Sequence, residues 1–225
     1  MILGRTLRWT QDGLKYEADP KHRKMILEHF GLDSECKKLT YNVDKDTKEE
    51  DWEWEPLPKE EATLFRALAA RMNYLSQDCP DLQFPIKQCS RDMASPLRGS
   101  WKKMKKIARY LLTRERIVWD FKWQDEPVFS YVAADSDWGG TIKDRKSTSG
   151  GVWMLGKHTI KTWSASQGAT ALSSAEAEFY AMIEDVLKAK GLVSLASELG
   201  FSALSNVVKI GTDSSAAKSF VSRRD

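Results

Sequence analysis

Apolar and polar residues alternate in two short runs at the start of the chain, on either side of Gln11-Asp12-Gly13. Alternation with a period of two is typical of strands, and Asp-Gly is a favoured hairpin turn, so the pattern predicts paired strands over 6–10 and 14–17. Asp19-Pro20 follows, and it combines an N-cap side chain with a proline suited to the first helical turn. We therefore expect a helix over 20–30 after the hairpin.

The apolar spacing changes to three or four residues between positions 60 and 116, which indicates amphipathic helices. The first predicted helix turns inward Leu64, Leu68, Met72 and Leu75. The second spans 97–112 and turns inward Trp101, Met104, Ala108 and Leu111. Lys102, Lys106 and Arg109 then fall together on the exposed face of this second helix.

Short β-type runs return in the C-terminal part of the chain and predict four strands. These runs are 128–134, 152–155, 158–165 and 207–212. The glycines at Gly139-Gly140 and at Ser149-Gly150-Gly151 flank a predicted turn between the first two strands.

A long helix is predicted between the third and fourth of these strands. Ser173 suits its N-cap, and Glu176 lies three residues later, where it can reach back to the backbone N–H of the cap residue. The expected apolar face comprises Tyr180, Ala181, Ile183 and Leu187. Gly191 interrupts the pattern and could break the helix.

Three carboxylates are expected to meet at one edge of this predicted sheet. Asp135 and Asp213 each end a predicted strand, and a strand–helix–strand crossover makes those two strands parallel neighbours. Ligands of such sheets bind beyond the carboxyl ends of the strands. Glu178, in the second turn of the helix, can face both aspartates. A single Glu is most often a solvated surface residue. Glu178 is therefore a candidate site residue only because the two aspartates are predicted to lie near it.

Converging carboxylates repel one another unless a cation neutralises them. An all-oxygen ligand set without Cys or His suits Mg2+ or Mn2+. Two such ions in one carboxylate cluster suit the hydrolysis of a phosphodiester.

Four motifs in this part resemble, in order, the ribonuclease H domain of copia-type retrotransposon Pol polyproteins. They are Tyr131–Gly140 (YVAADSDWGG), Asp144–Gly156 (DRKSTSGGVWMLG), Ala171–Tyr180 (ALSSAEAEFY) and Gly211–Ser214 (GTDS). The resemblance implies an α/β fold with a ribonuclease H-like mixed sheet and flanking helices. It also implies metal-dependent hydrolysis of the RNA strand in RNA–DNA hybrids, with two Mg2+ or Mn2+ ions. The family's catalytic carboxylates fall on Asp135, Glu178 and Asp213, whereas Asp137 and Glu176 match family positions without becoming ligands.

The resemblance also suggests an organisation for the whole chain. Residues 1–43 resemble the end of a reverse transcriptase palm, residues 44–59 form an acidic linker, residues 60–125 form a helical thumb or connection, and 126–225 form the ribonuclease H-like domain. The paired aspartates of the polymerase are not in this sequence, and no residue here matches the fourth ribonuclease H carboxylate. We therefore expect weak Mg2+ binding and slow or no cleavage. The alternative is an inactive truncated remnant of a retroelement, or a nucleic-acid-binding module without turnover.

Charge is segregated along the chain although the net charge is only +3. Acidic residues crowd 44–61, which favours a loop rather than a packed element, and basic residues crowd 98–116. The basic face described above could contact phosphates without sequence preference, or could simply be solvated. The candidates for contact with nucleic acid are Lys102, Lys106, Arg109, Arg145, Lys146 and Gln167.

The rest of the composition indicates where in the cell the protein is expected. No apolar run reaches the roughly 18 residues of a membrane helix, and the first residues lack the apolar core of a secretory signal. Three cysteines are an odd number without metal-ligand spacing, which suggests a reducing compartment. We expect an intracellular protein, in a cytoplasmic particle or the nucleus. Its expected partners are an RNA–DNA hybrid and the remainder of a Pol polyprotein, with no membrane.

Overall fold

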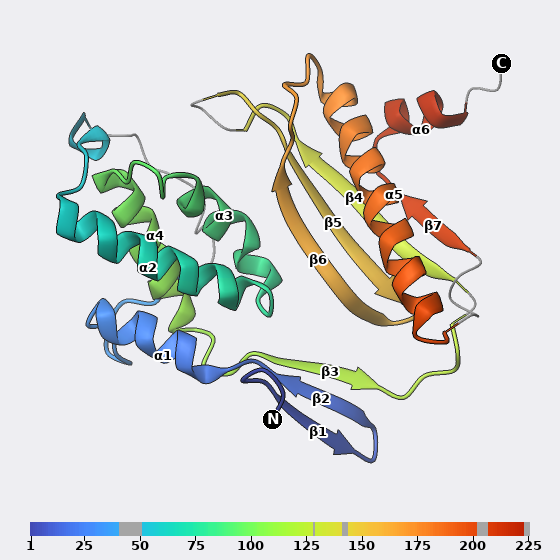
Figure 1. Ribbon diagram of the computed structural model, residues 1–225, viewed down its shortest axis with the longest axis horizontal. Coiled ribbons are helices and arrows are strands. Elements are labelled where there is room, and N and C mark those ends of the chain that lie inside the picture. Colours follow the sequence, from blue (N-terminus) through green and yellow to red (C-terminus); the bar gives the residue numbers. More distant parts are fainter. Residues whose placement is uncertain (41–50, 128, 141–143, 202–206, 223–225) are drawn as a thin grey trace. The chain divides into compact units, whose positions relative to one another are not determined.

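The structure is a computed structural model that describes residues 1–40, 51–127, 129–140, 144–201 and 207–222. Residues 44–50 of the predicted acidic linker lie outside this described part. The chain divides into two compact units, Met1–Trp123 and Gln124–Asp225. Both units combine helices with a sheet (Figure 1).

The first unit contains an antiparallel three-stranded sheet in the order β1-β2-β3, with β1 Thr6–Thr10, β2 Gly13–Glu17 and β3 Val118–Lys122. The predicted hairpin is confirmed. Gly13 is required at its turn, because an added Cβ would lie 2.0 Å from the carbonyl oxygen of Phe121 on β3. Strand β3 was not expected, since it belongs to a stretch predicted as helical. By pairing with β2 it adds the third strand to the sheet of the first unit.

The helices of the first unit are α1 Pro20–His29, α2 Lys59–Ser76, α3 Gln83–Arg91 and α4 Arg98–Leu111, with short 3-10 turns η1 Asp51–Trp54 and η2 Pro80–Leu82. Asp19 caps α1 as predicted, by accepting a hydrogen bond from the N–H of Lys21 at 2.9 Å. Three of the four inward positions expected for α2 are buried, but Leu64 is exposed and Phe65 takes its place in the core. The ring of Phe65 lies 6.2 Å from that of Trp101 on α4, centroid to centroid.

The end of the acidic segment is packed against α4, whereas its sequence favoured a loop rather than a packed element. Glu53 is only 6% exposed, and its carboxylate forms an ion pair with Lys102 on α4. Glu55 accepts a hydrogen bond from the side chain of Arg98 at 3.0 Å, and Leu57 is buried in the core. The basic helix therefore supplies the counter-charge that the acidic sequence lacks by itself.

The second unit contains a four-stranded mixed sheet in the order β6-β5-β4-β7. Its strands are β4 Ser130–Asp137, β5 Thr148–Leu155, β6 His158–Ser166 and β7 Val208–Gly211. Strands β4 and β7 run parallel, as the crossover argument predicted, and the other pairs are antiparallel. Helix α5 Ser174–Glu198 lies across one face of this sheet, and α6 Ser215–Ser222 packs on α5 through the rings of Phe220 and Phe179 (Figure 1).

Strand β5 begins earlier than predicted, because Ser149-Gly150-Gly151, which were expected to flank the turn before it, lie inside the strand. Gly151 has a packing reason. The indole of Trp163 on β6 lies so close that an added Cβ would be 2.3 Å from a ring atom. The indole N–H donates a 2.7 Å hydrogen bond to Asp185, which is fully buried on α5.

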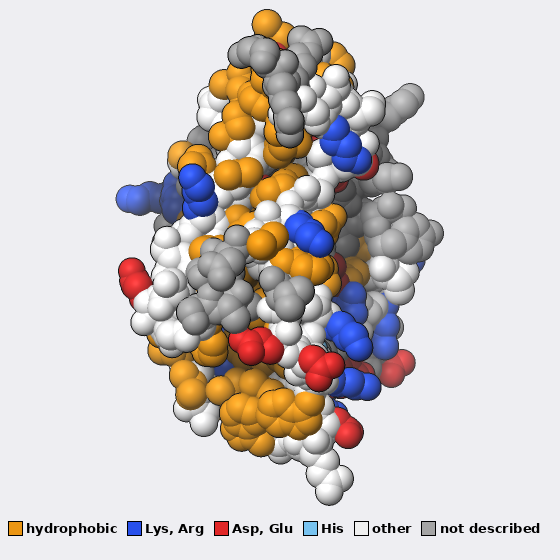
Figure 2. Space-filling model, turned by 90° about the vertical axis from the view of Figure 1, so that its right-hand side faces the viewer, with side chains coloured by type: hydrophobic (Ala, Val, Ile, Leu, Met, Phe, Trp, Pro, Cys, Tyr) orange, Lys and Arg blue, Asp and Glu red, His pale blue; other side chains and the backbone are white. Residues whose placement is uncertain are grey.

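The inner face of α5 also differs from the prediction. Ile183 and Leu187 are exposed, and the helix continues through Gly191 without a break. The buried residues are Ala177, Ala181, Met182, Asp185, Ala189 and Ala196. Figure 2 views the side on which α6 and β7 lie in Figure 1, and it shows apolar side chains at this surface. No helix in the described ranges is both long and apolar enough to cross a lipid bilayer.

Candidate metal centre

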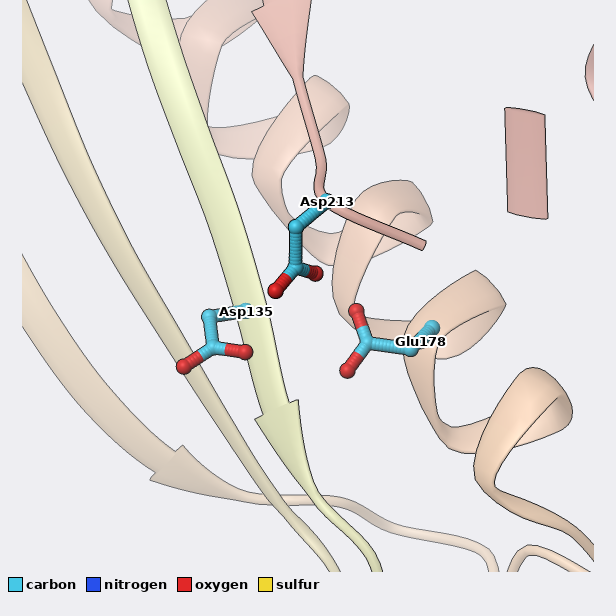
Figure 3. A group of neighbouring side chains, drawn as sticks. All are labelled: Asp135, Glu178 and Asp213. Carbon is cyan, nitrogen blue, oxygen red and sulfur yellow. The ribbon is translucent and has the colours of Figure 1, made fainter. Parts of the chain in front are cut away.

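The side chains of Asp135, Glu178 and Asp213 meet at one place in the second unit (Figure 3). One carboxylate oxygen from each lies within 4.8 Å of the other two. Asp135 and Asp213 are exposed and Glu178 is half-buried, so solvent can reach the cluster. The three residues come from β4, from α5 and from the segment that follows β7, so it is the tertiary fold that joins them.

Asp135 lies within β4 and not at its end, which corrects one detail of the prediction. The parallel pairing between β4 and β7 stops at Ala133 and Gly211, whereas the antiparallel pairing with β5 continues through Asp135. Asp135 therefore projects just beyond the end of the shorter strand. Asp213 follows that strand two residues later, which brings the two carboxylates to the same edge.

The start of α5 sets the position of Glu178. The hydroxyl of Ser173 accepts a 3.2 Å hydrogen bond from the N–H of Glu176, so the predicted N-cap is confirmed. Glu176 reaches back to the N–H of Leu172 at 2.8 Å, and not to that of the cap residue. It also accepts a hydrogen bond from the hydroxyl of Tyr180, which lowers the pKa of Glu176. Glu176 is thus engaged in capping, and Glu178 is the residue that faces the cluster.

The two carboxylate oxygens of Glu178 have different surroundings. Oε1 accepts hydrogen bonds from the backbone N–H of Ser136 at 3.1 Å and from its hydroxyl at 2.7 Å. Oε2 is buried, and no group in the described part of the chain hydrogen-bonds it. A buried carboxylate oxygen without a partner is costly. Three carboxylates with such an oxygen fit a hard divalent cation such as Mg2+ or Mn2+.

The remaining residues predicted near this centre have other roles or lie at its margin. Asp137 accepts a hydrogen bond from the N–H of Thr148 and so closes the turn before β5. Gln167 is buried, and its amide donates to the hydroxyl of Ser149 at 3.1 Å and to the carbonyl oxygen of Ala177 at 2.8 Å. The amide therefore joins the residue that follows β6 to β5 and α5. Arg145 is exposed in the turn.

The basic face predicted on α4 is more engaged than expected. Lys102, Lys106 and Arg109 are half-buried and not exposed. Lys102 is paired with Glu53, and Nε of Arg109 donates a 2.9 Å hydrogen bond to the carbonyl oxygen of Lys37. The ion pair with Glu53 could not be found from sequence spacing, because the two residues are 49 positions apart.

Comparisons with known proteins support a relation to mobile elements. The chain is 30% identical over 139 residues to the Retrovirus-related Pol polyprotein from transposon RE2 of Arabidopsis thaliana, which is 61% of this chain and 9% of that protein. It is 31% identical over 121 residues to the corresponding polyprotein of transposon TNT 1-94 of Nicotiana tabacum, again 9% of that protein. The chain is distantly similar to retrotransposon Pol polyproteins.

A shorter relative is also similar to this chain. The Secreted RxLR effector protein 161 of Plasmopara viticola is 29% identical over 119 residues, which cover 52% of this chain and 82% of that protein. No family model matches the chain, and no solved structure matches it. Because the matched stretch is less than a tenth of each polyprotein, the activities of those proteins do not transfer to this chain without further support.

Proposed function

We propose that the second unit is a ribonuclease H that hydrolyses the RNA strand of an RNA–DNA hybrid with the help of a divalent metal. The observation that carries this proposal is the convergence of Asp135, Glu178 and Asp213 within 4.8 Å. The distant similarity to Pol polyproteins supports it, because the four sequence motifs around these residues resemble the ribonuclease H domain of such polyproteins.

The roles of the chain's residues follow from their chemistry. Asp135 and Asp213 present exposed oxygens at the edge of the sheet, and Glu178 presents Oε2 from the helix, so the three would hold Mg2+ or Mn2+ between them. Bound in pairs, such ions supply an activated water and stabilise the leaving oxygen of a phosphodiester. The protein would recognise the hybrid by its shape, backbone and 2′-hydroxyls.

In this proposal the first unit is the end of a reverse transcriptase palm, over 1–43, followed by a thumb or connection over 60–125. Helix α4 would contact the phosphates of the hybrid through Lys102, Lys106 and Arg109, and the turn before β5 through Arg145 and Lys146. Such contacts give affinity without sequence preference. The partner in the cell would be the rest of a Pol polyprotein, in an intracellular particle or the nucleus.

The test is cleavage of a hybrid labelled on each strand, with the protein in excess and with Mg2+ or Mn2+ added. We expect slow cleavage of the RNA strand only, because the described cluster has three carboxylates and the resemblance implies four. The Asp135→Asn variant should cleave nothing, and the same sequence as duplex DNA should stay intact. Cleavage that survives in the variant would contradict the assignment.

The count of three carboxylates also favours one alternative, a nucleic-acid-binding protein without turnover. It predicts that the wild-type chain binds the hybrid but leaves both strands intact after long incubation with either metal. The same labelled hybrid, followed by anisotropy and by gel, separates the two functions.

A further inference from the structure

Ser136 lies at the junction of two elements that form the candidate metal centre. It directly follows Asp135 on β4, and it donates two hydrogen bonds to Glu178 on α5. Both bonds end on Oε1, at 3.1 Å from the backbone nitrogen and 2.7 Å from the hydroxyl.

The effect of this arrangement on Glu178 is specific. A glutamate side chain rotates about several bonds, and without restraint either oxygen could turn away from its neighbours. Two donors on Oε1 fix the plane of the carboxylate and leave Oε2 as the buried oxygen that no group among the described residues hydrogen-bonds. Because the donors belong to the residue beside Asp135, the same bonds also set how far Glu178 lies from Asp135.

We infer that Ser136 is a positioning residue that holds Glu178 in the orientation needed to bind a divalent metal. The inference rests on the proposed function, since it assumes that the three carboxylates bind a metal. Residues that hydrogen-bond the ligands of a metal site commonly change metal affinity by about 10- to 100-fold when they are removed. The hydroxyl of Ser136 supplies one of the two bonds, and a substitution can remove it while leaving the backbone bond in place.

The experiment is a titration of the full chain with Mn2+, followed by the loss of the free-ion EPR signal, alongside thermal unfolding of each variant. Ser136→Ala should weaken Mn2+ binding by about tenfold or more, and Ser136→Thr, which keeps the hydroxyl, should restore it. The matched control is Ser130→Ala. Ser130 is the first residue of β4, fully buried, and its hydroxyl has no partner in the described part of the chain.

The outcomes separate this inference from the proposed function. Unchanged Mn2+ binding in Ser136→Ala would overturn the role of Ser136, while loss of binding in Glu178→Gln would still support the metal site. Equal weakening in Ser136→Ala and Ser136→Thr would also overturn it, because the hydroxyl would then not matter. If wild type and Glu178→Gln bind Mn2+ equally, the metal site itself is wrong and the inference fails with it.

Discussion

Replacing Asp185 by Asn should stabilise the second unit at neutral pH. Asp185 is fully buried on α5 beneath the sheet, and only one of its oxygens is hydrogen-bonded, by the indole N–H of Trp163. Its Oδ2 has no partner among the described residues. Burial raises the pKa of Asp185 from 3.8 to about 6, while the hydrogen bond from Trp163 and the charge of Lys188 oppose this shift.

Proton linkage determines how the contribution of Asp185 to stability changes with pH. The folded state binds the proton of Asp185 more tightly than the unfolded state does. The stability that this proton contributes is therefore full below about pH 3.8 and is lost as the pH rises through about 6. The difference between the two pKa values corresponds to about 3 kcal/mol at neutral pH. Asn cannot ionise and can still accept the bond from Trp163. Its amide N–H would lack a partner, which costs about 1–3 kcal/mol, although protonated Asp has the same defect.

We therefore expect Asp185→Asn to gain about 1–3 kcal/mol of unfolding free energy at pH 7.5 and close to nothing near pH 4. Urea denaturation, with hydrogen exchange of peptides from β5 and α5 as the probe, measures this difference within the second unit. The control is Glu184→Gln. The ion pair of Glu184 with Lys188 is partly exposed, so its loss should change the unfolding free energy by less than about 1 kcal/mol. A gain of equal size at both pH values, or a loss at pH 7.5, would show that ionisation of the buried Asp185 does not destabilise the second unit.

Two further predictions concern packing and charge. Gly151→Ala should destabilise the second unit by about 1–3 kcal/mol in the same urea assay, because its methyl group would lie 2.3 Å from an indole atom; Gly150→Ala, with 3.9 Å of room, is the control. If α4 contacts phosphates as proposed, Lys106→Gln should lower the slope of log affinity against log salt by up to about one unit, because it removes one of the charges proposed to contact them. Lys102→Gln should lower it less, since Glu53 already neutralises Lys102, and equal effects would argue against that pairing in solution.

Features that depend on nearby residues could be predicted from the sequence. The Asp19 and Ser173 caps bond to N–H groups two and three residues away, and the hairpin turn is closed by adjacent residues. The three carboxylates could also be placed, because a strand–helix–strand unit has few allowed arrangements. The extension of β4 past Asp135 could not, since it depends on where β7 stops.

Features that depend on distant partners were missed for a physical reason. Apolar residues of α5 lie on more than one side of the helix, so spacing alone does not select the buried side. The sheet presents the large side chains Trp153 and Trp163, and the helix packs its small residues against them, which leaves Ile183 and Leu187 outside. The pairing of β3 with β2 likewise joins segments about a hundred positions apart, without a local signal.

Whether Asp135, Glu178 and Asp213 form one divalent metal site can be decided by measuring the binding of Mn2+. Asp135→Asn, Glu178→Gln and Asp213→Asn remove one charge each, and none of the three should change the fold of the first unit. We expect that Mn2+ binds the wild-type chain, that Mg2+ displaces it, and that each substitution weakens Mn2+ binding by more than about tenfold. A wild-type chain that binds no Mn2+, or three variants that bind it as well as wild type, would show that these carboxylates do not form a metal site.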